Sequence, residues 1–302
     1  MILVDNREVT NPYINLAMEE FLIRQADCSQ HDYVLFYVNE PCIVLGKNQS
    51  IYREVNFDFL RNSQLKLSRR VSGGGTVYQD EGNLSFAFIS RFEEHKVNNY
   101  TCFNQPVVEA LNRAGVPAVM DARNNILCEG KKISGNAQFT NRKNILSHGT
   151  LLVNANLPVL RSCLKPNLFP IETKAVSSVS SSVMNLSDYS EAFQNPAQLK
   201  KYLCAELNAK ESYRFNEEEW KEILKLAADK FETYSWIYGR SPVTYITKGG
   251  FKIKVEEGII EELTSDQEES LPRLTGIPYT AQHIKKALGD DPKADELMAR
   301  LF

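Results

Sequence analysis

Apolar residues recur along this chain in two periods, one typical of helices and one typical of strands. Near the start, Asn11 precedes Pro12, which favours the N-terminus of a helix because Asn caps it and Pro fits its first turn. Four apolar residues follow at helical spacing, namely Ile14, Ala17, Met18 and Phe21. We expect that stripe to face a core, and the polar residues Glu19, Glu20 and Arg24 to face solvent.

The same periods predict further helices and a series of strands. The predicted helices cover residues 106–114, 196–207, 216–231 and 281–288. The predicted strands cover residues 2–4, 33–38, 42–45, 65–69, 84–89 and 145–153. Two hairpins are expected, 125–129 with 131–138 turning at Gly130, and 251–255 with 258–263. Central strands with helices at their flanks predict an α+β fold, a mixed sheet covered by one helical layer.

Length and charge distribution indicate two domains. A chain of 302 residues, 43% of them hydrophobic, suits one large and one small domain better than a single core. Residues 235–242 form a candidate linker. From residue 243 onward 8 Lys and Arg stand against 11 Asp and Glu, whereas the rest of the chain is balanced. We expect a large domain at 1–242 and a small one at 243–302.

Several classes of protein do not fit this composition. A net charge of −3 gives no basic field for nucleic acid or an anionic membrane. The cysteines are far apart and form no Cys-x-x-Cys, so they predict neither a disulfide framework nor a zinc site. The apolar runs, such as YVLFYV, are too short to span a membrane, and the start lacks the apolar stretch of a secretory signal. A cytoplasmic protein is expected.

The most particular stretch is RRVSGGGTVYQDEGN, residues 69–83. Gly73, Gly74 and Gly75 (the glycine run) lack Cβ atoms, so successive amide N–H groups there can converge on an anion. The pattern matches neither a P-loop nor a dinucleotide-binding fingerprint. Positive charge would come from Arg69 and Arg70, whose guanidinium forks match phosphate or carboxylate oxygens. The alternative interpretation, without a ligand, is a tight turn with two surface arginines.

Three later segments carry polar chemistry. In GKKISGNAQ, residues 130–138, Lys131 and Lys132 are adjacent in a predicted strand and so point to opposite faces. One can face a cleft, although two surface lysines are the simpler interpretation. In SHGTLLV, residues 147–153, we expect His148 to be structural. The serine-rich stretch 174–185, KAVSSVSSSVMN, is either a flexible loop or a flap over a site, and its position alone favours the loop.

The order of these fragments resembles the lipoate–protein ligase A family. The matching pieces are RRVSGGGTVYQDEGN, ARNNILCEGKKISGNAQ, SHGTLLVNANL, SSVSSSVMNL, SWIYGRSPV and GGFKIKVEEGIIEEL. The resemblance implies a large α+β catalytic domain with the biotin/lipoate ligase fold and a small α+β accessory domain. It also implies that lipoate is activated with ATP and Mg²⁺ to lipoyl-AMP, without a tightly bound cofactor. The acyl group then passes to a lysine of a lipoyl domain, as in 2-oxoacid dehydrogenase E2 subunits, or of glycine-cleavage H protein.

The resemblance also implies site residues. Lys132 matches the lysine that contacts lipoate and phosphate, and Arg70 matches the arginine that holds the nucleotide. The other residues expected to bind the nucleotide or lipoyl-AMP are Ser72, Gly73, Gly74, Gly75, Thr76, Val77, Tyr78, Asn83, Asn125, Ser134 and Gly135. For the lipoate chain we expect an apolar slot walled by the strands 33–38 and 84–89. No metal ligand is assigned.

Some positions depart from the family pattern. Gln79 replaces a histidine, Asn125 a carboxylate and Asn136 a small residue. Phe139 replaces a basic residue, and Ser180 and Ser182 replace two arginines. Because lost cations weaken the binding of a triphosphate, a lipoyltransferase that uses preformed lipoyl-AMP or an acylated carrier competes with the ATP-dependent ligase. A thiol-dependent transferase using Cys128, a biotin ligase and a non-enzymatic binding protein are weaker hypotheses. A monomer is expected, while the preferred acceptor and the choice between lipoate and octanoate stay open.

Overall fold

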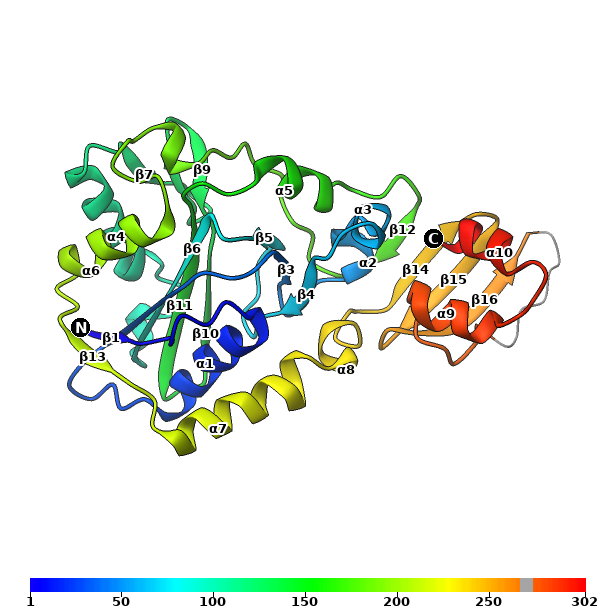
Figure 1. Cartoon of the computed structure of the whole chain (residues 1–302), viewed down its shortest axis with the longest axis horizontal. Helices are drawn as coiled ribbons and strands as arrows, with labels where there is room; N and C mark the ends of the chain where they lie inside the picture. The colour runs from blue at the N-terminus through cyan, green and yellow to red at the C-terminus, as the bar shows by residue number, and fades with distance from the viewer. Residues whose placement is uncertain (267–273) are drawn as a thin grey trace.

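The computed structural model describes residues 1–266 and 274–302. A mixed six-stranded sheet runs through its large part (Figure 1), in the order β10 (Asn136–Thr140), β11 (Asn144–Leu152), β6 (Asn83–Arg91), β2 (Tyr33–Tyr37), β1 (Ile2–Val4) and β13 (Glu211–Tyr213). β1 is parallel to both of its neighbours, and the other pairs are antiparallel. The α+β class and the mixed sheet with flanking helices are confirmed.

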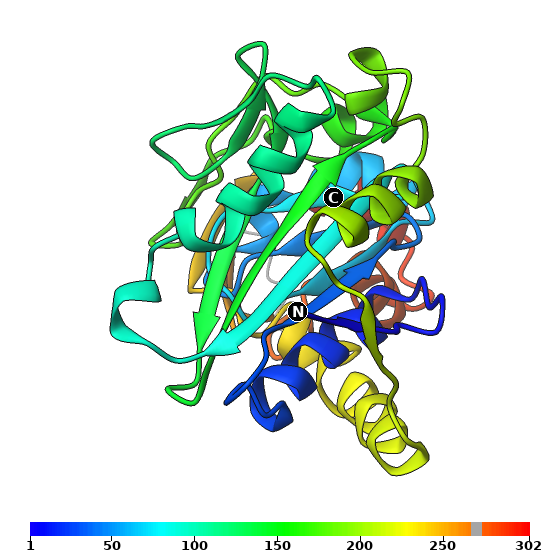
Figure 2. The same ribbon diagram turned by 90° about the vertical axis from the view of Figure 1, so that its left-hand side faces the viewer.

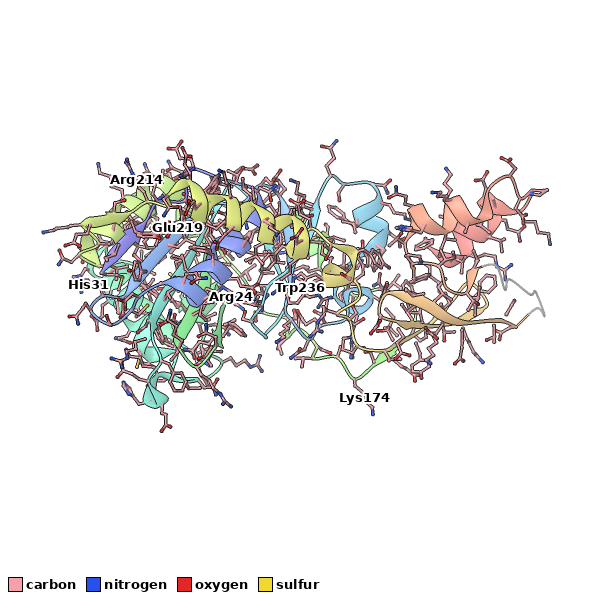
Figure 3. The ribbon with its side chains drawn as sticks, turned by 90° about the horizontal axis from the view of Figure 1, so that it is seen from below. Arg24, His31, Lys174, Arg214, Glu219 and Trp236 are labelled. Atoms are coloured by element: carbon pink, nitrogen blue, oxygen red, sulfur yellow. The ribbon has the colours of Figure 1, made fainter. Side chains whose placement is uncertain are left out.

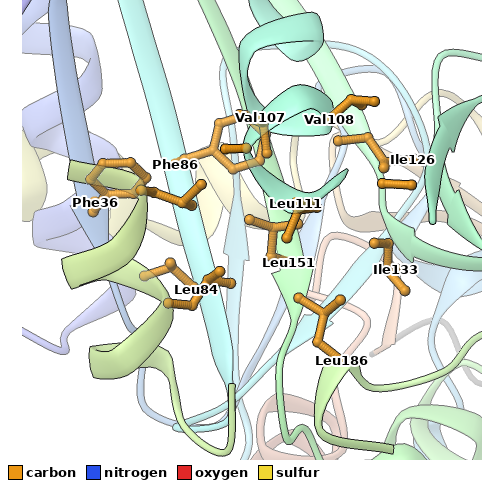
Figure 4. Close-up of a cluster of buried hydrophobic side chains, with 14 of the residues drawn as sticks. Phe36, Leu84, Phe86, Val107, Val108, Leu111, Ile126, Ile133, Leu151 and Leu186 are labelled. Carbon is orange, nitrogen blue, oxygen red and sulfur yellow. The ribbon is translucent and has the colours of Figure 1, made fainter. Parts of the chain in front are cut away.

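Helices cover both faces of this sheet, so the expectation of one helical layer is wrong. α4 (Thr101–Arg113) and α6 (Pro196–Glu206) pack on one face, and α1 (Pro12–Gln25) and α7 (Glu217–Leu226) on the other (Figure 2). The alternation of β6 explains this, because Leu84, Phe86 and Phe88 point to the first face and Ala87 and Ile89 to the second. Figure 4 shows the first core, where Phe36 and Phe86 meet Val107 and Leu111 of α4.

Two small sheets extend the large part. One has the order β4 (Lys66–Arg69), β3 (Cys42–Leu45), β5 (Val77–Gln79), and the other the order β7 (Ala118–Met120), β8 (Ile126–Cys128), β9 (Lys131–Ser134). The hairpin expected at 125–138 is therefore real, but its second strand ends at Ser134. After Gly135 the chain joins the six-stranded sheet as β10. The strands β2 and β3 belong to different sheets and form no hairpin.

Short helices fill the connections. They are α2 (Ile51–Glu54), α3 (Phe57–Arg61), η1 (Glu94–Lys96), α5 (Leu157–Cys163), η2 (Leu186–Asp188), the π-helical turn η3 (Ala227–Phe231) and α8 (Tyr234–Ile237). α4 begins at Thr101, so Pro106 lies inside it rather than in its first turn. In the described ranges 1–266 and 274–302, no helix is long and apolar enough to cross a membrane.

The expectation that Glu19 and Glu20 face solvent is wrong. α1 carries the predicted Asn11 cap, whose side chain accepts from Tyr13 N at 2.9 Å. However, α1 is covered by the sheet on one side and by α7 and η3 on the other, and Glu19 and Glu20 are 0% and 2% exposed. Glu20 pairs with Arg24 and with Lys230 of η3. Only charged or hydrogen-bonding partners make such burial tolerable.

The C-terminal part forms its own sheet at one end of the molecule (Figure 1), in the order β12 (Ile171–Thr173), β14 (Thr244–Lys248), β15 (Phe251–Glu256), β16 (Ile259–Ser265). The helices α9 (Ala281–Leu288) and α10 (Ala294–Leu301) pack on it. The predicted hairpin and the helix at 281–288 are confirmed. The strand β12 joins this sheet from before the predicted boundary, so the division at residue 242 stays a prediction.

Candidate functional site

A cavity of about 310 Å³ lies between the six-stranded sheet and the β4-β3-β5 sheet. One side is built by residues 74–77, which include the end of the glycine run, and by residues 135–137 and 148–150 of the β10–β11 region. Residues 176–179 and Ser181 of the serine-rich stretch 174–185 (the flap) border it on another side. Segments far apart in sequence thus meet at one cavity.

The glycine run lies between β4 and β5 and is closely packed at two of its three positions. A Cβ would lie 2.9 Å from Arg70 Nη2 at Gly74 and 3.1 Å from Ser178 Oγ at Gly75, whereas Gly73 has open space. Gly74 has a φ of +89°, a conformation that favours glycine. A Cβ at Gly46 would lie 2.1 Å from the carbonyl oxygen of Gly74, so the 46–49 loop approaches the run backbone to backbone. The amide of Thr76 points toward the flap and donates to Ser178 Oγ at 2.9 Å.

Arg70 lines the cavity and shapes the glycine run. Its Nη2 donates to the carbonyls of Gly73 at 2.5 Å and Gly75 at 2.9 Å, and its Nε donates to Ser72 Oγ at 3.0 Å. Burial lowers the pKa of Arg70 to about 10, and the carboxylate of Glu19 acts in the opposite direction. The guanidinium therefore fixes the loop and still presents positive charge at the cavity wall.

The expectation that Arg69 also offers charge to an anion is wrong. Arg69 is 0% exposed and points away from the cavity. Its guanidinium donates to Gly46 O (2.9 Å), Gln49 O (2.7 Å) and Ile237 O (2.6 Å). Consecutive strand residues face opposite ways, so one arginine serves the cavity and the other serves the structure beneath it.

Lys132 reaches the cavity while Lys131 is exposed, as the strand alternation predicts. A Cβ at Gly135 would lie 2.9 Å from Lys132 Nζ, so the missing side chain at 135 leaves space for the ammonium. Burial lowers the pKa of Lys132, Asp121 raises it, and Arg70 lowers it. The Asp121 carboxylate is held by Asn125, whose N and Nδ2 both donate to it at 2.8 Å.

The flap contacts both halves of this site. Ser178 Oγ donates to the buried carboxylate of Glu54, and Gln49 Nε2 donates to Ser178 Oγ at 3.1 Å. Further along, Lys132 N donates to Ser182 O at 2.8 Å, and Met184 N donates to Lys132 O at 3.2 Å. Position alone favoured a free loop, but these contacts join the flap to the glycine run and to the backbone of Lys132. It is a flap over the cavity.

Only one of the two strands expected to form the apolar wall contributes to it. Tyr37 of β2 lines the cavity, but no residue of 84–89 does, although β6 lies between β2 and β11 and both of these strands contribute to the lining. The wall opposite is completed by Leu16 of α1, Val44 of β3 and Ala137 of β10. His148 of β11 also lines it, with Nε2 at 2.6 Å from Ser72 Oγ and Nδ1 at 2.8 Å from Glu19 Oε2.

The structure brings most of the predicted site residues to the cavity wall. Those that line it are Arg70, Gly74, Gly75, Thr76, Val77, Asn125, Lys132 and Gly135. The predicted residues outside the lining are Ser72, Gly73, Tyr78, Asn83 and Ser134, of which all but Gly73 are buried. Among these, Gly73 and Ser72 contact Arg70 and so act on the wall indirectly.

The structure shows what surrounds four of the residues that depart from the family pattern. Gln79 lines the cavity and accepts from Asn39 Nδ2 at 2.5 Å. Phe139 lies under the ammonium of Lys47, 5.8 Å from its ring centroid, so a cation is present there without a basic residue at 139. Ser180 and Ser182 are exposed and lie outside the lining.

Sequence reasoning missed Glu19, Gln49 and Glu54. All are buried polar residues that contact the lining, and the helical period gave a wrong expectation for Glu19. Cys128, proposed as a possible nucleophile, is 0% exposed in a hydrophobic core, and burial raises its pKa. Both properties are unsuited to a reactive thiol. Within residues 1–266 and 274–302, no group of His, Cys, Asp and Glu is arranged to hold a metal ion.

Comparisons with known proteins agree with this arrangement. Residues 11–208 match the family described as the lipoyl protein ligase A/B catalytic domain. Lipoate-protein ligase LplJ of Bacillus subtilis (strain 168) is 37% identical over 249 residues, which span 80% of this chain and 75% of that protein. Lipoate–protein ligase 1 of Staphylococcus aureus is 34% identical over 309 residues, spanning 96% of this chain and 94% of that protein.

Solved structures share the fold. A bipartite lipoate protein ligase from Thermoplasma acidophilum, described with its E2 lipoyl domain, has a TM-score of 0.68 at 23% identity, covering 79% of this chain and 96% of that one. A lipoate-protein ligase A bound with ATP has a TM-score of 0.67 at 23% identity, covering 80% and 98%. From the match over residues 11–208 and the identity to curated relatives along the chain, this protein is an enzyme of the lipoate–protein ligase family.

Proposed function

We propose that this enzyme attaches lipoate to a specific lysine of a lipoyl-domain protein or of glycine-cleavage H protein, with ATP as the activating substrate and lipoyl-AMP as the intermediate. The observation that carries the proposal is the composition of one cavity. Arg70, Lys132 and the glycine run border it together with the apolar side chains of Leu16 and Val44. An acyl adenylate has these two halves, an anionic phosphate and an apolar acyl chain.

Lys132 is the proposed catalytic residue. A carboxylate oxygen of lipoate attacks the α-phosphorus of ATP, and pyrophosphate leaves with the electron pair of the broken P–O bond. Two anions must meet in this step, and an ammonium between them offsets their repulsion. Burial lowers the pKa of Lys132, and the nearby Asp121 carboxylate acts against this effect and so favours the charged ammonium. Arg70 and the amides of the glycine run, including Gly74 and Gly75, are proposed to hold the adenylate phosphate.

The second step needs no protein nucleophile. The neutral amine of the acceptor lysine attacks the acyl carbonyl, an amide forms, and AMP leaves as the amine loses a proton. The burial of Cys128 agrees with a route without an acyl-enzyme on that thiol. Support for an acceptor of this kind comes from the Thermoplasma acidophilum relative, described with an E2 lipoyl domain. Monomeric state, cytoplasmic location and the domain division at 242 are parts of the same proposal.

Mg²⁺ does not have a protein-built site here. No carboxylate lines the cavity among residues 1–266 and 274–302. Three carboxylates contact or neighbour the lining, and each is already bonded, that of Asp121 to Asn125, that of Glu54 to Ser178 and that of Glu19 to Tyr37 and His148. Mg²⁺ is commonly bound through substrate phosphates with few protein ligands. We therefore assign no residue to the metal and route no step through it.

A second candidate function is transfer of an acyl group from preformed lipoyl-AMP or from an acylated carrier protein. The flap residues that border the cavity are serines and valines, so the flap supplies no cation there. Cations at the wall come instead from Arg70, Arg123 and Lys132. We rank the ligase first because these three remain to hold a triphosphate.

The deciding experiment measures lipoate-dependent exchange of pyrophosphate into ATP in the presence of Mg²⁺. A parallel reaction supplies lipoyl-AMP and an apo lipoyl domain or apo H protein. Exchange together with acceptor modification supports the ligase. Modification from lipoyl-AMP without exchange supports the transferase instead. If neither reaction occurs, both functions are rejected.

Replacing Lys132 tests the catalytic assignment. For Lys132→Ala we expect the rate of pyrophosphate exchange to fall about 100- to 1,000-fold, as when a donor to developing charge is removed. Lys131→Ala is the matched control, because Lys131 is adjacent and exposed on the opposite face. Its exchange rate should equal that of the wild type. A normal rate for Lys132→Ala would refute the role of this lysine.

A further inference from the structure

Five buried side chains form a continuous hydrogen-bonded chain that runs from Arg70 to Tyr37, both at the cavity wall, through Glu19 of α1. Tyr37 Oη donates to Glu19 Oε1 at 2.9 Å, and His148 Nδ1 lies 2.8 Å from Glu19 Oε2. His148 Nε2 lies 2.6 Å from Ser72 Oγ, which accepts from Arg70 Nε at 3.0 Å. We call Tyr37, Glu19, His148, Ser72 and Arg70 the Glu19 network. None of the five is more than 7% exposed.

The proton positions in this network follow from its two ends. Arg70 Nε–H can only donate, so Ser72 Oγ accepts from it and keeps its own proton for another partner. His148 Nε2 is the acceptor within reach, which places the imidazole proton on Nδ1, directed at the Glu19 carboxylate. Burial and the Glu19 charge both raise the pKa of Tyr37, so it donates its hydroxyl proton. We assign a neutral His148 in the Nδ1–H tautomer from these contacts.

A hydroxyl, an imidazole and a carboxylate in this order also occur in nucleophilic triads. Here the hydroxyl cannot serve as a nucleophile. Ser72 is 1% exposed, lies outside the cavity lining, and its oxygen is already bonded to Arg70. The set therefore acts on Arg70 rather than on an acyl group.

We propose that Glu19, acting through His148 and Ser72, sets the orientation of Arg70 and with it the backbone of the glycine run. The end of the chain supports this, because Arg70 Nη2 holds the carbonyls of both Gly73 and Gly75. Ser72 at Nε and Val44 O, which accepts from Nη1 at 3.3 Å, together fix the plane of the guanidinium. Nη2 in that plane then determines where the two carbonyls lie. Glu19, His148 and Ser72 are positioning residues. The expected effect on the exchange rate rests on the proposed function. The proton arrangement within the Glu19 network does not depend on that function.

The substitution Glu19→Gln tests whether Glu19 positions Arg70 or only fills space. Glu19→Gln keeps the shape but offers one acceptor oxygen to two donors, Tyr37 O–H and His148 Nδ1–H. When the amide oxygen accepts from Tyr37 O–H, the amide N–H faces His148 Nδ1. His148 is then driven to the Nε2–H tautomer, which cannot accept from Ser72. We expect the pyrophosphate exchange rate to fall about tenfold or more, since small misplacements in a site have effects of this size.

Removing the competing donor should reverse the effect. In Glu19→Gln/Tyr37→Phe the amide oxygen is free to accept from His148 Nδ1–H, so the exchange rate should return most of the way to that of Tyr37→Phe alone. A further loss of rate in the double variant would contradict the shared acceptor, because the coupling between contacting residues can have either sign. Glu20→Gln is the matched control, since Glu20 is the adjacent buried carboxylate of α1 and pairs with Arg24 and Lys230 instead.

Nitrogen NMR of ¹⁵N-histidine-labelled protein reads the tautomer directly, with 4 histidines to assign. The expected result is a neutral Nδ1–H imidazole for His148 in the wild type, in Glu20→Gln and in the double variant, and a changed state in Glu19→Gln. A protonated or Nε2–H His148 in the wild type, or a double variant no more active than Glu19→Gln, overturns the inference. If the wild type neither exchanges pyrophosphate nor transfers from lipoyl-AMP, the proposed function fails, while the NMR result still decides the network.

Discussion

At the scale of single residues, the site depends on one position where a side chain is missing. Gly135 directly follows β9, and an added Cβ there would lie 2.9 Å from Nζ and 3.0 Å from Cε of Lys132. These are the far atoms of a flexible side chain, which can move aside without disturbing the backbone. Gly130, just before β9 begins, differs: it has a φ of +71° and open space around it.

Alanine at these two glycines should therefore separate activity from stability. Gly135→Ala is expected to displace the ammonium of Lys132, lowering the pyrophosphate exchange rate by about 100-fold, while the urea unfolding midpoint changes little. Gly130→Ala should keep the exchange rate and lose about 1 kcal/mol of unfolding free energy, because a side chain is strained at positive φ. Normal exchange in Gly135→Ala would show that the Lys132 ammonium does not need its present place.

At the scale of elements, two sets of contacts hold the flap against the cavity. Its first contact is Ser178, which joins Glu54, Gln49 and Thr76 through one hydroxyl. Its second is the backbone pairing of 182–184 with Lys132. The hydroxyl of Ser178 also accepts from the Thr76 amide at the end of the glycine run.

Removing that hydroxyl should loosen the flap without unfolding the protein. A hydrogen bond to a charged group contributes about 1.5–3 kcal/mol, so in Ser178→Ala we expect limited proteolysis within 174–182 to accelerate about tenfold or more. Ser180→Ala is the control, because Ser180 is exposed and lies outside the cavity lining. Equal cleavage rates for the two variants would mean that Ser178 does not hold the flap.

At the scale of the whole molecule, the large part and the C-terminal sheet share a buried junction. Ile43 and Tyr52 belong to the same hydrophobic cluster as Ile246 and Phe251, and Ser50 Oγ lies 2.8 Å from Thr244 Oγ1. Arg69 joins the 46–49 loop under the glycine run to Ile237 and Ser241 just before that sheet. Figure 3, seen from below, places Trp236 at this junction, where its Nε1 donates to Arg69 O at 2.7 Å.

Loss of Arg69 should therefore destabilise the whole protein. Arg69→Ala removes the donor to the carbonyls of Gln49 and Ile237, whereas Gly46 O keeps its bond from Gln49 N. Each buried unpaired group costs about 1–3 kcal/mol. We expect the unfolding free energy, measured with urea, to fall by at least about 3 kcal/mol. Arg240→Ala, an exposed arginine nearby, should stay within about 0.5 kcal/mol of the wild type. A small effect at Arg69 would contradict its structural assignment.

Much of the fold was predictable because helices and strands obey local rules. The Asn11 cap, the 281–288 helix, the 251–263 hairpin and the alternation of Lys131 with Lys132 all depend on residues a few positions apart. These features need no knowledge of distant contacts. The expectation that the glycine run and Lys132 share one site came instead from the resemblance to the family, not from local rules.

Only the tertiary structure decided the role of chemically identical neighbours. Arg69 and Arg70 are equivalent in sequence, and their partners at Ile237 and Gly75 distinguish them. Glu19 lies on the polar side of its helical period, yet it is buried because its partner His148 is 129 residues away. A hydrophobic period records the preference of one element for water, whereas burial of a charge depends on a partner that only the folded chain supplies.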